Sequence, residues 1–331
     1  MWGSLDRSGD GAKRGRMAAA EFDLEADVRT RAAWLYYMEG MTQDAVAQAL
    51  GMTRARVLRI LASCREDGTV QITVNSPLAA SVALARRIES RFGMERVIVI
   101  PRPQSDTDVG TLIGAATGSY VTSILADGMT VGLGWGRTLS SSLSSLPQRA
   151  FNKLTVVSLL GGLTRASQFN PSEFAWRFAD RLGAECFMMA APVYAPDART
   201  REALVNHAGM EDVFKHAERL DVALISVGEL SPGSTLSRYG LASKEELASL
   251  ARAGAVGDLL CRFIDAEGRL LDHPLNDRVI SADPVMLRRA RRIVLASGGW
   301  EKASAVLAAI RLLKPEVLIT DETVAESLAA A

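Results

Sequence analysis

Residues 42–61 read TQDAVAQALGMTRARVLRIL, and this stretch decides the fold of the N-terminal part of the chain. Ala47 is small enough for one helix to touch the next, and Gly51, four residues later, allows the positive φ of a sharp turn. Val57 and Ile60 then fall on the inner face of a second helix. Small, glycine, apolar and apolar residues at these spacings are typical of a helix-turn-helix.

Threonines stand where both helices are expected to begin. Thr42 and Thr53 each precede a helical pattern and can cap it, so the sequence predicts helices over Gln43–Leu50 and from Thr53 to about Glu66. Residues Thr69–Val74 then alternate between apolar and polar like a short strand. This strand is either the wing of a winged helix-turn-helix or a plain connector.

The outward positions of the second helix are basic. Arg54, Arg56 and Arg59 face away from the predicted core, and no acidic residue interrupts residues 53–65. The amino end of such a helix enters the major groove, where arginine contacts guanine or binds phosphate. We therefore expect a unit that binds double-stranded DNA, with a solvated basic helix in an ordinary helical hairpin as the alternative. The residues expected at the DNA are Thr42, Gln43, Thr53, Arg54, Ala55, Arg56 and Arg59.

The composition excludes several classes of protein. In 331 residues, 38 Lys and Arg balance 38 Asp and Glu, so the chain is not a globally basic protein that coats nucleic acid. Its three cysteines and three histidines are scattered, so we expect no disulfide framework, no metal site and no cofactor. No apolar run approaches the roughly 18 residues that span a bilayer. We therefore expect a cytoplasmic protein with no membrane partner.

The chain is expected to have three regions. Residues 1–20 are rich in Gly, Arg and Asp and lack the apolar segment of a signal peptide, which predicts a disordered tail. A helix over Val28–Met38 and the helix-turn-helix make a DNA-binding domain of residues 21–76. An amphipathic helix over Leu78–Phe92 then links it to a large domain of residues 77–331.

In the large domain, short apolar strands alternate with longer helices. This alternation predicts a Rossmann-like α/β fold, with a mostly parallel sheet covered by helices on both faces. The expected strands are Val97–Ile100, Thr130–Gly134, Leu154–Leu160, Glu185–Met189, Val222–Val227, Arg292–Ala296 and Val317–Thr320. The expected helices are Thr111–Ala126, Arg137–Ser145, Ser172–Leu182, Lys244–Ala251, Glu301–Leu312 and Thr323–Leu328.

Glycine-rich loops follow two of these strands. VGLGWGRTL, residues 131–139, joins a strand to a helix and places Arg137 and Thr138 at the helix start. SGGWEK, residues 297–302, does the same with Lys302. Glycines let the backbone approach a ligand, and the carboxyl ends of parallel strands are where such sheets bind ligands. A dinucleotide site is disfavoured, because the glycine spacing differs and no ribose-binding acid follows.

In these segments the chain resembles the SorC/DeoR-type sugar-binding transcriptional regulators. The resemblance covers almost all of the chain after the tail and is carried by WLYYMEGMTQDAVAQALGMTRARVLRIL, VGLGWGRTL, GAVGDLLCRFID at residues 254–265, and SGGWEKASAVLAAIRLLKPEVLITDE at residues 297–322. It implies a winged helix-turn-helix followed by an effector and oligomerisation domain related to sugar-phosphate isomerases. It also implies a homodimer or homotetramer whose operator binding responds to a small carbohydrate.

The resemblance further implies which residues contact the effector. They are Gly134, Gly136, Arg137 and Thr138 as a phosphate loop, with Asn170, Asp258 and Lys302. Each of three residues has an alternative role that remains open: Asn170 as a helix cap, Asp258 in a turn at the edge of the core, and Lys302 as a solvated lysine. The Trp-Gly-Arg that precedes Thr138 replaces the small hydroxyl residues usual in phosphosugar sensors. The effector is thus a sugar phosphate, a sugar or a sugar alcohol.

A sugar-phosphate isomerase-like enzyme is the alternative function. Such an enzyme needs an acidic base and a histidine for ring opening, and His207, His216 and His273 all lie outside the glycine-rich loops. Fusion to a DNA-binding unit also favours sensing over turnover. We therefore expect a non-enzymatic regulator of a carbohydrate-utilisation operon.

Overall fold

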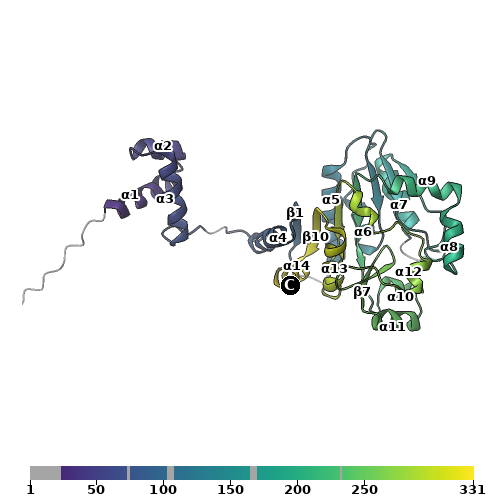
Figure 1. Cartoon of the computed structure of the whole chain (residues 1–331). Helices are drawn as coiled ribbons and strands as arrows, with labels where there is room; N and C mark the ends of the chain where they lie inside the picture. Colours follow the sequence, from purple (N-terminus) through teal and green to yellow (C-terminus); the bar gives the residue numbers. More distant parts are fainter. Residues whose placement is uncertain (1–23, 73–74, 103–107, 165–169, 232) are drawn as a thin grey trace, which may run out of the picture. The chain divides into compact units, whose positions relative to one another are not determined.

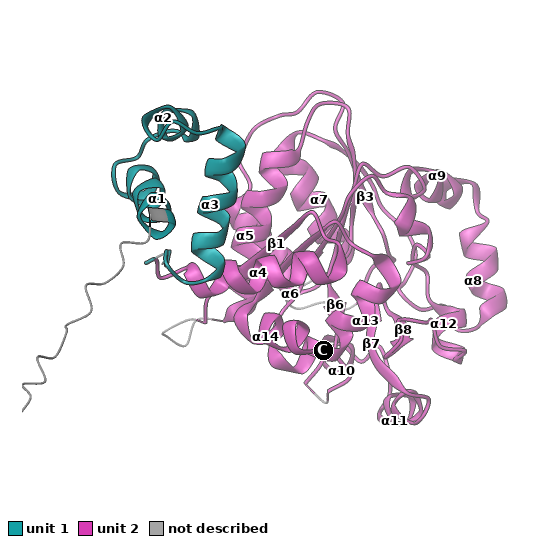
Figure 2. Ribbon diagram, turned by 60° about the vertical axis from the view of Figure 1, so that its left-hand side comes forward, with its two compact units in different colours: residues 1–75 teal, residues 76–331 magenta. Residues whose placement is uncertain are grey.

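The computed structural model describes residues 24–72, 75–102, 108–164, 170–231 and 233–331. The chain divides into two compact units, residues 1–75 and residues 76–331 (Figure 2). No described helix is both long and apolar enough to cross a membrane. The predicted disordered tail, residues 1–20, lies outside the described residues.

The small unit is helical, as predicted. Thr42 Oγ1 accepts a hydrogen bond from the Ala45 N–H at 3.2 Å, and Thr53 Oγ1 accepts one from the Arg56 N–H at 3.3 Å. Both threonines therefore cap helices where the sequence predicts them. The helices are α1 (Leu24–Ala33) with a π-helical turn over Trp34–Met38, α2 (Gln43–Ala49) and α3 (Arg54–Glu66) (Figure 1).

The turn between α2 and α3 forms as its sequence requires. Gly51 has a φ of +61°, and the next N–H, from Met52, donates to the Ala47 carbonyl at 2.9 Å. Val57 is fully buried, and Ile60 packs against the same core from a partly exposed position. The core that fixes the angle between the two helices is made of Ala32, Val46, Ala47, Val57 and Leu61.

Two details of the small unit differ from the prediction. The helix predicted over Val28–Met38 is π-helical in its last five residues, and Met38 at its end is 68% exposed. The strand expected over Thr69–Val74 is absent from its described part, residues 69–72, and its last two residues lie outside the description. Here Asp67 Oδ1 accepts from both the N–H and the hydroxyl of Thr69, an Asx-type turn that competes with strand pairing.

The large unit is built on a seven-stranded, entirely parallel sheet in the order β1-β10-β9-β5-β2-β3-β4. Each of its strands coincides with one predicted from the sequence. The strands are β1 (Arg96–Ile100), β2 (Thr130–Leu133), β3 (Thr155–Ser158), β4 (Glu185–Phe187), β5 (Val222–Ile225), β9 (Ile293–Ala296) and β10 (Val317–Asp321).

Helices cover both faces of this sheet, because its strands are apolar on both sides. In β5, Val222 and Leu224 enter one buried cluster, whereas Ala223 and Ile225 enter the other. One face carries α5 (Val109–Ile124), α6 (Arg137–Ser141) with the 3₁₀ turn Ser142–Ser145, and α7 (Pro171–Leu182). The other carries α4 (Ala79–Phe92), α9 (Ala208–Ala217), α13 (Ala303–Leu313) and α14 (Glu322–Ala330), with α4 and α14 side by side (Figure 2).

A second, antiparallel sheet, which is not expected from the sequence, has three strands, β6 (Val227–Gly228), β7 (Ala255–Leu259) and β8 (Arg262–Asp265). The β7–β8 turn consists of Leu260 and Cys261, with φ angles of +53° and +61°. Such turns normally contain Asn or Gly, so the usual hairpin signal is missing. Helices α8 (Ala198–Val205), α10 (Thr235–Arg238), α11 (Lys244–Arg252) and α12 (Pro274–Arg278) complete the unit, and only α11 was predicted.

The strand order creates one place where the connections diverge. From β2 the chain moves to β3 on one side, whereas from β5 it moves to β9 on the other, although β2 and β5 are neighbours. The loops after β2 and β5 therefore separate at the carboxyl edge and leave a crevice. In open parallel sheets, this switch point is where ligands bind.

Candidate functional site

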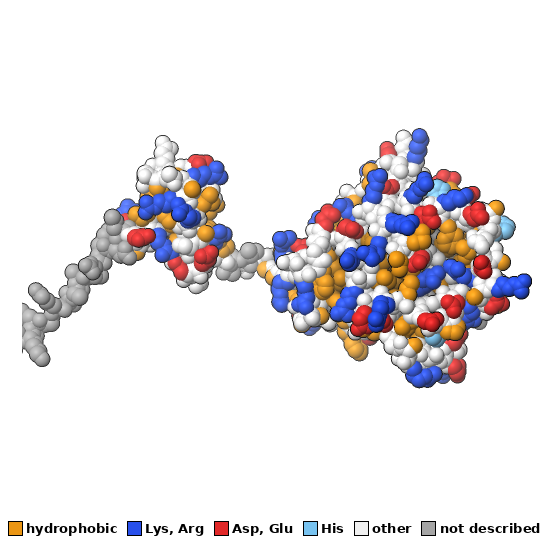
Figure 3. Space-filling model, viewed as in Figure 1, with side chains coloured by type: hydrophobic (Ala, Val, Ile, Leu, Met, Phe, Trp, Pro, Cys, Tyr) orange, Lys and Arg blue, Asp and Glu red, His pale blue; other side chains and the backbone are white. Residues whose placement is uncertain are grey.

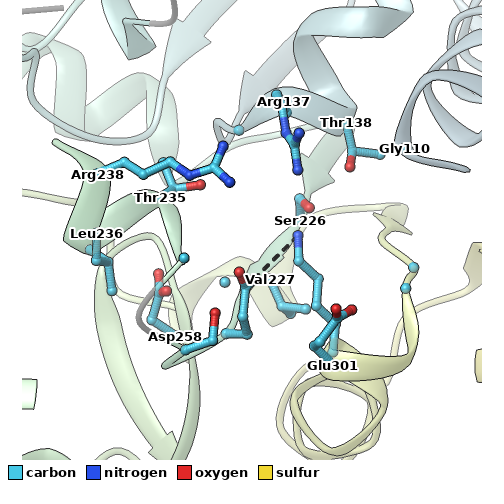
Figure 4. A pocket seen from close by; sticks show the side chains of 18 of the residues that line it. Gly110, Arg137, Thr138, Ser226, Val227, Thr235, Leu236, Arg238, Asp258 and Glu301 are labelled. Atoms are coloured by element: carbon cyan, nitrogen blue, oxygen red, sulfur yellow. Dashed lines mark ion pairs between the residues drawn. The ribbon is translucent and has the colours of Figure 1, made fainter. Parts of the chain in front are cut away.

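A cavity of about 410 Å³ opens at this switch point. Its volume falls within the roughly 300–1,000 Å³ of small-molecule sites. The walls come from segments that follow β2, β5 and β9, from α10 and from β7 (Figure 4). The described lining residues with polar or aromatic side chains are Asp108, Trp135, Arg137, Thr138, Ser226, Glu229, Ser231, Thr235, Arg238, Asp258, Glu301 and Lys302.

The loop after β2 forms one wall. Gly136 has a φ of +123°, which favours glycine, and it turns the chain so that Arg137 and Thr138 begin α6. Arg137 Nη1 lies 3.8 Å from Asp108 Oδ2, and both side chains are about half exposed. A Cβ at Gly114 of α5 would lie 2.5 Å from the Thr138 carbonyl oxygen. Glycine at this position thus allows the close packing of α5 on α6 that holds the loop.

The loop after β9 forms the facing wall. Gly299 has a φ of +96°, and its N–H donates to Asp321 Oδ2 at 2.7 Å. Asp321 is 3% exposed and also caps α14, so it fixes the loop from behind the cavity. Lys302 follows at the start of α13, with its side chain 23% exposed.

Three charged side chains, Asp258, Glu229 and Lys302, form an inner cluster in the cavity. Lys302 Nζ lies 3.7 Å from Glu229 Oε2, the ion pair drawn as a dashed line in Figure 4. Asp258 is 4% exposed, and its Oδ2 accepts from the Cys261 N–H at 2.9 Å. Its Oδ1 lies so close to Gly228 that a Cβ there would collide with it. The β6–β7 pairing therefore determines where this carboxylate points.

The buried carboxyl of Asp258 is electrostatically unusual. Burial raises the pKa of Asp258 to about 6, even though the Cys261 N–H and the charge of Lys302 both lower it. The neighbouring Glu229 adds to the increase in the pKa. The carboxylate is therefore mostly ionised at neutral pH, but it is held there at a cost in free energy.

The structure brings together five of the seven residues expected at the effector: Gly136, Arg137, Thr138, Asp258 and Lys302. Gly134 lies behind the lining, where its N–H continues the sheet pairing by donating to the Leu224 carbonyl at 2.8 Å. Asn170 caps α7 and accepts from the Ser172 N–H at 3.2 Å, while its amide donates to the Leu163 carbonyl at 2.9 Å. Neither Gly134 nor Asn170 belongs to the described lining of the cavity.

Several lining residues were missed by the sequence analysis. Ser226 lies near the carboxyl end of the strand predicted over Val222–Val227, and Glu229 lies two residues beyond it, so the carboxyl-end rule could have found them. Arg238 belongs to the one-turn helix α10, for which the sequence carries no periodic signal. Figure 4 shows Arg238 and Arg137 reaching toward the cavity from different elements, with Asp258 on another side. Within the described ranges, no group of three His, Cys, Asp or Glu could hold a metal ion.

In the small unit, the residues expected at DNA lie on α2, α3 and their caps. Thr53, Arg54, Ala55, Arg56 and Arg59 are exposed. Arg54 Nε donates to Gln43 Oε1 at 3.3 Å and lies 3.7 Å from Asp44 Oδ1, so this guanidinium is already oriented. Figure 3 shows basic side chains gathered on the visible face of this unit. Such a surface can neutralise DNA phosphates and reach base edges.

Comparison with known proteins gives matches that span both units. Residues 76–330 match the sugar-binding domain family ("Sugar-bind"). The chain is 32% identical to the erythritol catabolism regulatory protein EryD of Brucella abortus, over 92% of this chain and 97% of that protein. It is 27% identical to the sorbitol operon regulator of Klebsiella pneumoniae, over 91% of this chain and 98% of that one. The crystal structure of full-length SorC from Klebsiella pneumoniae superimposes with a TM-score of 0.71 and 26% identity, covering 92% of this chain and 99% of that one.

These relatives are named as a regulatory protein of erythritol catabolism and as a regulator of the sorbitol operon, and the matches run through both units. The chain belongs to the SorC/DeoR-type family of sugar-binding transcriptional regulators.

Proposed function

We propose that the cavity of the large unit binds the small carbohydrate that controls operator binding by the small unit, and that Arg137, Thr138, Asp258 and Lys302 contact it. One observation carries this assignment. Charged and hydroxyl side chains from three strand ends meet in one cavity at the switch point of a sugar-binding domain. Mixed donors and acceptors of this kind suit the hydroxyl groups of a carbohydrate.

The proposed operator contacts are made by the exposed residues of α3 and its cap and by Thr42 and Gln43. One helix-turn-helix makes few base contacts, so specific binding calls for at least two copies on paired half-sites. We therefore propose a homodimer or homotetramer that acts in the cytoplasm, where its operator lies. Light scattering of the full chain with operator DNA tests this, and a monomer bound to the operator would contradict it.

The protein is proposed to sense the carbohydrate and not to convert it. The named relatives are regulators, and no histidine occurs among the described residues that line the cavity. Ring opening of a sugar by general acid–base catalysis uses such a group. Incubation with sugars and sugar phosphates, followed by product analysis, tests this. Turnover that depends on Asp258 would contradict it.

Lys302→Ala tests the effector assignment. The variant should bind operator DNA as the wild type does, because Lys302 lies outside the small unit. Its response to effector should weaken by about 10- to 100-fold, the usual effect of losing a charged hydrogen bond. Fluorescence anisotropy of labelled operator during an effector titration measures both quantities. Lys244→Ala, an exposed lysine on α11, is the matched control, and an unchanged titration for Lys302→Ala would remove this residue from the site.

A further inference from the structure

We propose that the effector of this cavity is an uncharged polyhydroxy compound, a sugar or sugar alcohol without a phosphate group. The inference rests on the function proposed above and narrows its ligand class. It is based on the charged side chains that line the cavity and on the hydrogen bonds that a ligand can form with them.

The described lining has an excess of acidic side chains. Three of these residues are basic and four are acidic. They are Arg137, Arg238 and Lys302 on the basic side, and Asp108, Glu229, Asp258 and Glu301 on the acidic side. A phosphate ester brings nearly two negative charges at neutral pH, and this lining offers no net positive charge to balance them.

Two of the three basic groups already have acidic partners. Arg137 lies 3.8 Å from Asp108, and Lys302 lies 3.7 Å from Glu229. A phosphate would have to compete with a carboxylate for either cation. A hydroxyl group can instead join such a pair, because it accepts from the cation and donates to the carboxylate.

The third basic group does not change this balance. Arg238 is exposed, and no ion pair joins it to another described residue. Glu301, in the same lining, is likewise in no ion pair with a described residue, so the count of charged side chains still leaves one acidic group in excess. The charge left over is that of Asp258, the most buried acidic side chain of the lining.

Hydrogen bonding in the inner cluster leads to the same ligand class. An ionised carboxylate can only accept, and phosphate oxygens also act mainly as acceptors. Asp258 is 4% exposed, and the Cys261 N–H is the donor that reaches it within the described chain. A ligand hydroxyl can donate a further hydrogen bond to this carboxylate, whereas a phosphate oxygen would place acceptor against acceptor. Contact between two acceptors is unfavourable, so this difference selects for hydroxyl groups.

The neighbouring aromatic surface suits the same ligand. Trp135 lines the cavity, is 9% exposed and has its ring centroid 6.3 Å from that of Tyr239. An indole face packs against the C–H groups of a polyol without requiring charge. The small exposed part of Trp135 thus adds apolar surface to the donors and acceptors of the lining.

The test compares each polyol with its own phosphate ester. Full-length protein is titrated calorimetrically at pH 7.5 with erythritol and sorbitol, with erythritol 4-phosphate and sorbitol 6-phosphate, and with inorganic phosphate. We expect one polyol to bind at least ten-fold more tightly than its ester, and inorganic phosphate not to bind. An ester that binds more tightly than its polyol overturns the inference but leaves the proposed function standing. Binding of no carbohydrate in the panel overturns both.

A charge variant tests the physical cause. Glu229→Gln removes one negative charge from the inner cluster and frees Lys302, so the affinity for the ester should rise at least ten-fold relative to that for the polyol. Glu267→Gln is the matched control, since Glu267 is 62% exposed, pairs with Arg269 and lies outside the described lining. An unchanged ratio in Glu229→Gln would show that the acidic lining does not exclude phosphate and would overturn the inference.

Discussion

The two units of this regulator present their functional residues in different ways. In the small unit, every residue proposed at the operator lies between Thr42 and Arg59, on two consecutive helices and their caps. In the large unit, the cavity collects side chains from Asp108 to Lys302, carried by segments that meet only when the sheet is assembled. The first surface is therefore set by local helical geometry, and the second by strand order.

This difference teaches which parts of each site are separable. A helix displays successive turns on one face at fixed spacing, so a basic face exists as soon as the helix is formed. A cavity between loops exists only if distant strands pair in the right order. The two units also have separate buried clusters. Mutations can therefore test whether each function depends only on its own unit.

The largest effect is expected when the small core is damaged. Leu61 is 3% exposed, and Leu61→Ala should lower the free energy of unfolding of the small unit by about 2–5 kcal/mol. Operator binding should be lost while effector binding persists, as measured by anisotropy and calorimetry on one sample. Leu58→Ala on the same helix, where Leu58 is 44% exposed, is the control. Loss of effector binding in Leu61→Ala would show that the units are not independent.

The next effect concerns the buried charge of the cavity. The native pKa of Asp258, about 6, lies above its ordinary value of 3.8, so the native state holds the proton more tightly than the unfolded state. The contribution of this group to stability therefore falls as pH rises from about 4 to about 6, by about 2–3 kcal/mol.

In Asp258→Asn this decline should disappear, while operator binding remains and effector binding weakens. Denaturant unfolding at pH 4.5 and pH 7.5 measures the difference between variant and wild type, in which other titrating groups cancel. Exposed Asp272→Asn should keep the pH dependence of the wild type. If Asp258→Asn unfolded with the same pH dependence as the wild type, burial would not raise the pKa of this carboxyl.

Operator binding by α3, the helix proposed to contact DNA, should respond to a single arginine. Arg56→Ala should weaken operator binding by about 1–3 kcal/mol if Arg56 contacts a base, without changing effector affinity. A loss that is equal for operator and unrelated DNA would make Arg56 a phosphate contact. Arg65→Ala, at the far end of α3, is the matched control. Unchanged affinity in Arg56→Ala at low and high salt would remove Arg56 from the interface.

The smallest effect tests how the cavity wall is held. Gly114→Ala would bring a methyl group against the Thr138 carbonyl and Ser141, an overpacking cost of about 1–3 kcal/mol that is partly offset by the better helix propensity of alanine. We expect a net loss of about 1–2 kcal/mol and weaker effector binding. Ser119→Ala, exposed on the same helix, is the control. Unchanged effector affinity would show that the loop tolerates a shift of α5.

Much of the fold could be predicted because its signals are local. Every strand of the parallel sheet was found, since each is a short apolar run and most are followed by a helical pattern. The β7–β8 hairpin was missed because Leu260 and Cys261 occupy turn positions that usually hold Asn or Gly. The strand expected at Thr69 was wrong over its described residues, because Asp67 binds that threonine after the end of α3.

The sequence by itself determined the helix-turn-helix, with its threonine caps, the glycine at the turn and the outward arginines, because each depends on residues a few positions apart. It also determined that glycine-rich loops follow β2 and β9. Only the tertiary structure decided that these loops border one cavity, that Gly134 and Asn170 lie outside its lining, and that Arg238 lies within it. The physical reason is that a strand order which brings β5 beside β2 is fixed by packing across the whole sheet and not by any local pattern.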